Sequence, residues 1–240
     1  ANLSADLRPA DVRYVGITST YPAYGWQGLN GSNTQIYFGL AGYAAWATPN
    51  EVQYRVYIST TGPGGVGPAD DVPEYVLVNT SLGAVLSGSG SSRPDDVFQA
   101  WMYRILPDGT LTARQGANWN LIAPPSSSTS LDSAPFNTAT MILPTTASVL
   151  GLPSTAPVFN FYVETYARDA GNFSELVDRV PATGTITYDL RTPAVAPLNQ
   201  TSIGAGMGRG PLFIGVDSAR IGGIVNQARL AERRSQDVVL

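Results

Sequence analysis

The chain of 240 residues contains no cysteine and no histidine, and each of its fourteen basic residues is an arginine. The missing cysteine excludes disulfides, thiolate zinc sites and cysteine nucleophiles. The missing histidine excludes a Ser-His-Asp triad, because that mechanism needs an imidazole as general base. These absences remove the usual means of activating a nucleophile, so the sequence predicts a protein that is not an enzyme.

Charge is also scarce, at 13% of residues, and the net charge is −4. The arginines are scattered apart from Arg229, Arg233 and Arg234, and no basic stripe is present that could neutralise phosphates. We therefore expect no nucleic-acid partner. No apolar run approaches the roughly 20 residues that a membrane-spanning helix needs, so we expect no membrane insertion. The chain begins at Ala1 rather than at Met, as a processed product or an excised region would.

Glycine (25) and proline (18) are plentiful and divide the chain into short segments. The clearest segment covers 52–59, where Val52, Tyr54, Val56 and Ile58 alternate with Gln53, Arg55, Tyr57 and Ser59. That period of two predicts a half-buried strand. The stretch 97–115 predicts a hairpin that turns at Pro-Asp-Gly.

About ten such strands, with turn signals every 8 to 15 residues or so, predict an all-β fold. We expect a β-sandwich with immunoglobulin-like or jelly-roll connections. One short helix is expected near the C-terminus, at 226–235. Residues 1–195 would form the sandwich, and 196–240 would pack onto it.

The apolar side of each predicted strand gives the expected core. Along 157–169, Phe159, Phe161, Val163 and Thr165 share one side, and Val158, Asn160, Tyr162, Glu164 and Tyr166 share the other. We expect Phe161, Trp46 and Trp101 to be buried. The sequence also contains five Asn-x-Ser/Thr glycosylation motifs, a number close to chance for so Ser/Thr-rich a chain, at Asn2, Asn30, Asn79, Asn172 and Asn199.

Several stretches occur in an order that is similar to a known family. They are "EYVLVNTSLG", "DDVFQAWMY", "MILPTTASVLGL", "FNFYVETYARD" and "GTITYDL". Together they resemble the C-terminal β-rich accessory region of secreted bacterial subtilisin-like serine peptidases, without the catalytic domain. The resemblance implies an extracellular or cell-surface module. It implies no peptidase activity here, because no histidine is available for the triad.

The same family often carries an Asp-rich loop that binds Ca²⁺ between the strands matching 52–59 and 74–79. In this chain the early acidic positions are Ser59, Thr60 and Thr61, and only Asp70, Asp71 and Glu74 remain. Because Ca²⁺ takes about 6 to 8 oxygen ligands, three unevenly spaced carboxylates are weak support for a site. We expect no cofactor and little stabilisation by Ca²⁺.

Two other groups are candidates for ligand binding or catalysis. Tyr21, Tyr24 and Trp26 crowd one loop and could stack on sugar rings, although pinning the loop to the core is the commoner role. A glycosidase would need a pair of carboxylates. The available ones are Asp132, Glu164, Asp169, Glu175 and Asp178, and no spacing selects a pair among them.

The sequence thus favours a non-catalytic extracellular β-sandwich module with a structural, adhesion or assembly role, possible partners being copies of itself or cell-surface polymers. One alternative is a subunit of a surface filament built by strand addition. Its basis is the ending at Val238, Val239 and Leu240, which reads as the start of a strand. The other alternative is a carbohydrate-binding module that uses the loop aromatics.

Overall fold

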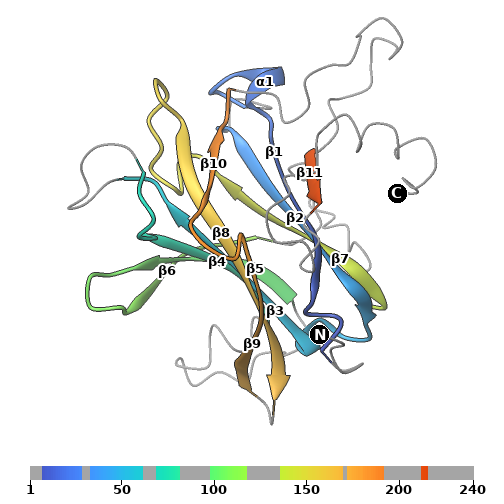
Figure 1. Cartoon of the computed structure of the whole chain (residues 1–240). Coiled ribbons are helices and arrows are strands. Elements are labelled where there is room, and N and C mark those ends of the chain that lie inside the picture. Colours follow the sequence, from blue (N-terminus) through green and yellow to red (C-terminus); the bar gives the residue numbers. More distant parts are fainter. Residues whose placement is uncertain are drawn as a thin grey trace, which may run out of the picture.

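The computed structural model describes residues 7–28, 33–61, 69–81, 98–117, 136–169, 172–191 and 212–215. These residues form eleven strands and two short helical segments (Figure 1). In chain order they are β1 (Val12–Ser19), α1 (Tyr21–Tyr24), β2 (Gln35–Trp46), η2 (Pro49–Glu51), β3 (Val52–Ser59), β4 (Tyr75–Ser81), β5 (Phe98–Ile105), β6 (Leu111–Ala117), β7 (Thr138–Thr146), β8 (Val158–Asp169), β9 (Asn172–Val180), β10 (Ile186–Asp189) and β11 (Leu212–Gly215).

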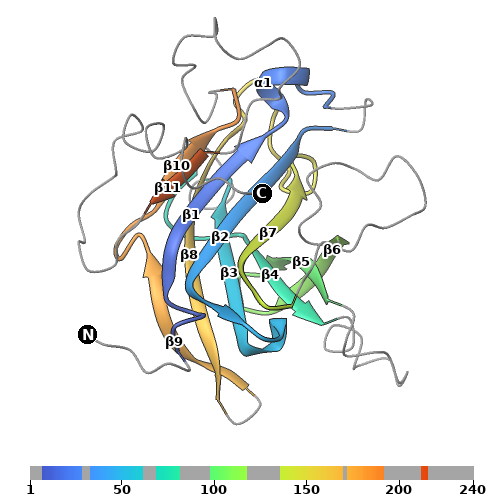
Figure 2. The ribbon, with the colours of Figure 1, turned by 90° about the vertical axis from the view of Figure 1, so that its right-hand side faces the viewer.

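The strands pair into two antiparallel sheets. A four-stranded sheet has the order β11-β1-β2-β7, and a seven-stranded sheet has the order β10-β8-β3-β4-β5-β6, with β9 also paired to β8. Figure 2 shows β1, β2 and β7 in front of β3, β4 and β8. The predicted all-β sandwich is therefore confirmed.

The order of the strands resembles that of the immunoglobulin fold, without a described strand in the D position. β1, β2 and β7 take the places of strands A, B and E, and β8, β3 and β4 take those of F, C and C′. β9 and β10 share the G position, because β9 pairs with 163–169 of β8 and β10 pairs with 158–161 along the same edge. Of the two predicted alternatives, the chain adopts the immunoglobulin-like one.

The core lies between the sheets and follows the predicted alternation. Phe161 and Trp46 are 1% and 0% exposed, as expected from the sequence. Phe161 packs edge-to-face on Phe38 from the opposite sheet, with ring centroids 5.3 Å apart. Trp46 makes the same kind of contact with Tyr54 at 6.0 Å. These aromatic pairs join the two layers near the middle of the sandwich.

The prediction for Trp101 is wrong. In β5 the core-facing residues are Ala100 and Met102, each 1% exposed, so Trp101 between them faces the outside of the sheet. There its indole lies against Gly116, where an added Cβ would come within 2.7 Å of the ring. The run "VFQAWMY" is apolar on both sides, so periodicity could not decide which side was the core.

The segment before β1 is tied to the seven-stranded sheet by buried hydroxyls. The Tyr54 hydroxyl donates to the Pro9 carbonyl at 2.9 Å, and the Thr165 hydroxyl donates to the Ala10 carbonyl. Gly42 makes room for this approach, because a Cβ there would lie 2.4 Å from the Pro9 carbonyl oxygen.

Asp178 on β9 makes a further contact, with the first residue of β1, and the ionisation of its carboxyl makes the stability of the fold depend on pH. Its carboxylate accepts the Val12 backbone N–H at 3.3 Å. Burial raises the pKa of Asp178 above its usual 3.8, despite hydrogen bonds from the Arg179 and Val12 amides that lower it. The folded chain therefore binds the proton more tightly than the unfolded chain, and the ionised carboxylate costs stability once the pH rises through the folded-state pKa.

We predict that Asp178→Asn, which keeps an acceptor oxygen for Val12, unfolds at a higher denaturant concentration than the parent at pH 7. The advantage should shrink as the pH falls below about 4, where the parent carboxyl is protonated in both states. Urea melts between pH 3 and 7 measure this. An advantage that is constant across that range would contradict the assigned cause.

The C-terminal part is described only at β11. Leu212–Gly215 pairs antiparallel with Tyr14–Ile17 of β1, at the edge of the four-stranded sheet. The helix expected at 226–235 lies outside the described residues.

Candidate interaction surface

Six polar and aromatic side chains meet on the outer face of the seven-stranded sheet. They are Arg55 and Tyr57 of β3, Tyr162, Glu164 and Tyr166 of β8, and Arg179 of β9, and we call them the outer-face array. Their neighbours along each strand, such as Val56 and Val163, are completely buried in the core. Strand alternation therefore places the array on the opposite side.

A three-layer stack runs across the array. Tyr57 and Tyr162 are direct cross-strand partners, and their rings stack with centroids 4.8 Å apart at an interplanar angle of 14°. The Arg179 guanidinium lies over the Tyr162 ring, 4.2 Å from its centroid. The same guanidinium donates to the Pro181 and Gly184 carbonyls at 2.7 and 3.1 Å, which fixes its position.

A second stack lies beside the first, and the Glu164 carboxylate contacts both of them. The Arg55 guanidinium lies over the Tyr166 ring at 3.9 Å from the centroid, and its Nε donates to Gln53 at 2.6 Å. The Tyr166 hydroxyl donates to Glu164 at 2.6 Å. The other Glu164 oxygen lies 3.8 Å from Arg179 Nε. Glu164 thus joins both stacks into one network.

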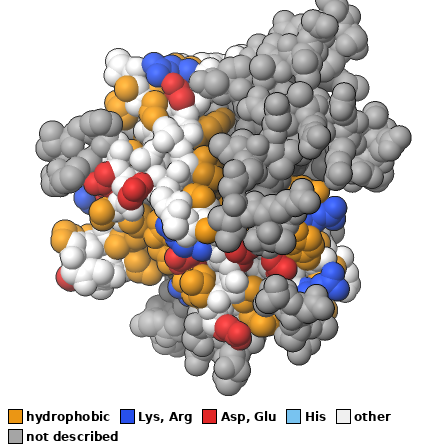
Figure 3. All heavy atoms as spheres, in the orientation of Figure 1, with side chains coloured by type: hydrophobic (Ala, Val, Ile, Leu, Met, Phe, Trp, Pro, Cys, Tyr) orange, Lys and Arg blue, Asp and Glu red, His pale blue; other side chains and the backbone are white. Residues whose placement is uncertain are grey.

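The outward side of the sheet continues across β4 and β5 with mainly apolar side chains, of which Val76 and Val78 are only 2% and 8% exposed. Val76 and Val78 of β4 lie beside β3, and Tyr103 and Trp101 of β5 are their cross-strand partners. The Trp101 indole N–H donates to Gln99 at 3.0 Å. Figure 3 shows hydrophobic side chains gathered over the region of β4, β5 and β6, next to charged side chains.

Tyr162 and Tyr166 remain neutral at physiological pH. Burial, followed by the charge of Glu164, raises the pKa of Tyr162 to about 12. Burial and the hydrogen bond to Glu164 raise the pKa of Tyr166 as well. Both phenols therefore keep their protons near pH 7, and Tyr166 donates its own to Glu164.

The geometry suits protein recognition better than sugar stacking. Tyr162 has Tyr57 on one side and Arg179 on the other, and Tyr166 has Arg55 over its ring, so these ring faces are already occupied. The surface offers ring edges, hydroxyls and guanidiniums that are held in place. Tyrosine, tryptophan and arginine are the residues enriched at the centres of protein interfaces.

Glu164 cannot form a glycosidase pair with either Glu175 or Asp178. Glu164 faces outward, whereas Asp178 and Glu175 are opposite Thr165 and Ala167, both of which are buried in the core. Glu164 is thus on the other side of the sheet from these two, and no sugar ring could lie between them. Asp132 and the side chain of Asp169 are outside the described residues.

The predicted acidic cluster is engaged by donors of its own chain. Glu74 accepts from the Thr60 backbone N–H at 2.7 Å and from the Thr61 hydroxyl at 3.0 Å. Asp70 accepts from the Val72 backbone N–H at 2.7 Å, which closes a tight turn. The threonines that replace the acidic positions of the resembled family thus act as donors to Glu74.

Asp71 points elsewhere and accepts from the Thr185 hydroxyl at 2.6 Å. Asn160 of β8 holds the same loop by donating to the Ala69 and Asp70 carbonyls at 3.2 and 3.1 Å. Asn160 therefore fastens the β3–β4 loop to β8, and Asp71 fastens it to Thr185 just before β10, while Glu74 and Asp70 bond within the loop itself. Within the described ranges, no three acidic side chains are grouped to share a metal ion.

The three loop aromatics do not form one flat surface. Tyr21 and Trp26 meet edge-to-face at 6.5 Å with an interplanar angle of 69°, and both pack against the core. The loop is closed by the Thr34 hydroxyl, which donates to the Trp26 carbonyl at 3.2 Å. Tyr24 is the exposed member, at 53%. The trio thus mainly pins α1 to the sandwich.

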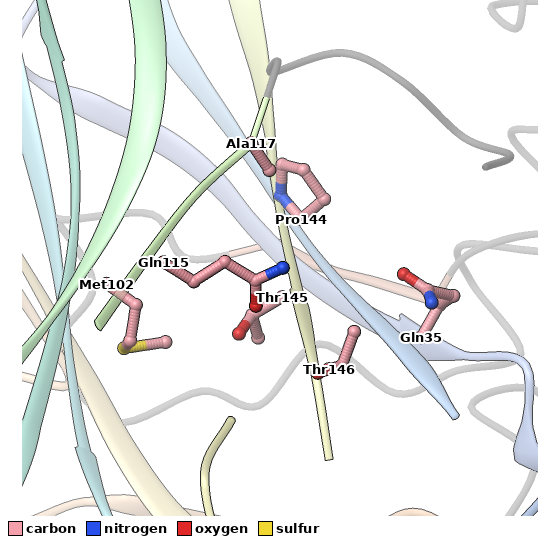
Figure 4. A pocket seen from close by; sticks show the side chains of 7 residues that line it. All are labelled: Gln35, Met102, Gln115, Ala117, Pro144, Thr145 and Thr146. Atoms are coloured by element: carbon pink, nitrogen blue, oxygen red, sulfur yellow. The ribbon is translucent and has the colours of Figure 1, made fainter. Parts of the chain in front are cut away.

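A small cavity opens between the two sheets at the β6–β7 side. It holds about 40 Å³ and is lined by Gln35, Met102, Gln115, Ala117, Pro144, Thr145 and Thr146, from β2, β5, β6 and β7 (Figure 4). That is room for about one water molecule, against the roughly 300 Å³ or more of typical ligand sites. The lining contains no ionisable side chain.

Val238, Val239 and Leu240, the residues predicted for assembly, lie outside the described residues. Among the residues that the structure describes, no helix is both long and apolar enough to cross a membrane. No protein-family model, no curated protein and no solved structure matches the chain.

Sequence reasoning identified the two tyrosines that share a face with Glu164 but missed the array. The missing information was the register that sets Tyr57 beside Tyr162 and Glu164 beside Arg55. The available signal was the alternation itself, because β3 and β8 each place polar and aromatic residues at every second position.

Proposed function

We propose that this chain is a non-catalytic extracellular β-sandwich module with a structural, adhesion or assembly role, of the kind that accompanies secreted subtilisin-like peptidases. The outer-face array is its candidate surface for contact with another protein. The proposal is carried by one observation: the array's arginines, tyrosines and carboxylate are half-buried and held by one another on the outer face of the sheet. Such an arrangement is rigid before binding, which lowers the entropy cost of association.

Different observations bear on the two alternative functions, a carbohydrate-binding module and a filament subunit. A carbohydrate-binding module needs exposed ring faces, and of its three candidate residues only Tyr24 offers a largely exposed side chain. A filament subunit needs an open strand edge. The seven-stranded sheet has such an edge at β6, where five consecutive residues, 111–115, are exposed.

We predict no turnover of peptide, ester or glycoside substrates above the buffer rate. The reason is that the chain has no histidine, cysteine or lysine, and Glu164 lies on the other side of the sheet from Glu175 and Asp178. A panel of chromogenic substrates and a fluorophosphonate probe measure this. Labelling of a single serine, with turnover that its alanine variant loses, would overturn the proposal.

Two further measurements separate the proposal from its rivals. Pull-down with insoluble cellulose, chitin and peptidoglycan should retain no more of the parent than of Tyr24→Ala. Retention of the parent alone would favour the carbohydrate-binding module. Immunoblots of the producing cells should find the protein in the medium or the surface fraction, and its confinement to the cell interior would contradict the extracellular role.

A further inference from the structure

Among the residues that the structure describes, the seven-stranded sheet ends in two edges, β6 on one side and β9 with β10 on the other. Figure 2 shows β6 and β9 on opposite sides of the molecule. Because β9 and β10 share one edge of β8, the sheet is six strand positions wide, and the facing sheet has only four strands. The wider sheet therefore extends past the narrower one, and β6 is exposed on both faces.

Each of these edges carries one large exposed apolar side chain. Leu111 of β6 is 52% exposed and Leu176 of β9 is 51% exposed. Leu111 is the cross-strand partner of Ile105, and Leu176 is that of Tyr166. Both leucines therefore lie on the outer face of the sheet. Exposed edge strands with apolar residues are templates for pairing with another chain.

The two edges carry opposite charges. The basic residues at the β6 edge are Arg114 and, on the adjacent strand, Arg104, and both are exposed. On β9 the exposed charged residue is Glu175. Pairing β6 with β6, or β9 with β9, would bring like charges together, whereas pairing β6 with β9 brings opposite charges together.

Strand direction allows the same pairing. All five steps from β9 through β8, β3, β4 and β5 to β6 are antiparallel. An odd number of reversals leaves β6 antiparallel to β9. A copy shifted sideways in the plane of the sheet would therefore place its β9 antiparallel to β6, with the outer faces on the same side.

The other edges are less suited to strand addition. The four-stranded sheet ends on one side at β7, whose Pro144 has no N–H to donate, and on the other at β11, which has four residues. Proline and short length are features that protect a sheet edge from pairing. β6 has seven residues and contains no proline.

We propose that β6 of one chain pairs with β9 of a second copy of this chain, joining copies head to tail through a continuous sheet. The register sets Leu111 opposite Leu176 of the next copy and Thr112 opposite Glu175. Arg114, at the bulge of β6 two residues beyond Thr112, would bring its positive charge to the same part of the contact as that glutamate. Because the contact is heterologous, it propagates into an open filament. This inference goes beyond the proposed function and does not depend on the outer-face array.

Variants with one altered edge each, β6 or β9, test this pairing by sedimentation velocity over a hundredfold range of protein concentration. The parent should assemble, while Leu111→Arg and Leu176→Arg should each be monomeric. An equimolar mixture of the two should stop at two chains, because one partner keeps an intact β6 and the other an intact β9. Tyr24→Arg, which changes a residue of equal exposure away from both edges, should assemble like the parent. Thermal melts verify that all variants fold.

Single cysteines report the register, because the chain has none of its own. Mixed Leu111→Cys and Leu176→Cys should form a disulfide between the two variants on oxidation, since opposite residues on paired strands lie about 4.5 to 5.5 Å apart. Neither variant alone should do so. A parent that stays monomeric throughout, an edge variant that assembles like the parent, or cross-linking of Leu111→Cys with itself would overturn the head-to-tail pairing. A monomeric parent without turnover would leave the proposed function standing.

Discussion

Replacing Phe161 by alanine is expected to lower the free energy of unfolding by about 3 to 5 kcal/mol. The side chain is 1% exposed and lies where the two sheets meet. Its ring packs on Phe38 of β2 at 5.3 Å and on Phe159 of the same strand at 6.2 Å. Truncation would leave a cavity between two rigid sheets, which cannot collapse to fill it. Urea denaturation of the parent and the variant measures the loss.

The matched control is Phe136→Ala, the same substitution at a residue that is 48% exposed. Phe136 meets Phe98 edge-to-face at 5.9 Å, so its removal should cost under about 1 kcal/mol. Comparable losses for the two variants would mean that burial between the sheets does not determine the cost. A loss below about 1 kcal/mol for Phe161→Ala would mean that the core was assigned to the wrong face of β8.

Strand faces were predictable from the sequence where only one face was apolar. In β3 and β8 the alternation is clean, and the buried residues are those that the period of two selects. In β5 both faces are apolar, with Met102 toward the core and Trp101 toward the outside. The sequence could not choose between them, because the outer face of this sheet is itself an aromatic surface.

The candidate surface required contacts that no single strand encodes. Tyr57 and Tyr162 are 105 residues apart, and only the β3–β8 register brings their rings together. The same holds for the acidic loop, whose Asp71 is joined to Thr185 of the β9–β10 turn. Composition excluded several chemistries from the start, but the places where polar groups meet depend on long-range pairing.

The sequence motif at Asn79 and the structure around its side chain suggest different roles for this residue. It begins an Asn-x-Ser motif, yet its side chain is 4% exposed. The amide oxygen accepts from the Tyr54 N–H at 2.6 Å, and the amide nitrogen donates to the Val52 carbonyl at 2.9 Å. The side chain thus extends the ladder between β3 and β4 beyond the last backbone pair, Arg55 with Val78.

Asn79→Ala is therefore expected to cost about 2 to 5 kcal/mol, because it leaves one buried N–H and one buried carbonyl without partners, at about 1 to 3 kcal/mol each. Ser81→Ala is the control, since it removes the same glycosylation motif and keeps the Asn79 amide. Its cost should be about 1 kcal/mol, the usual contribution of one hydroxyl hydrogen bond. Urea melts of the unglycosylated protein compare the three chains. Equal losses for the two variants would show that the amide does not join β3 to β4, and a glycan on Asn79 of the folded protein would contradict its burial.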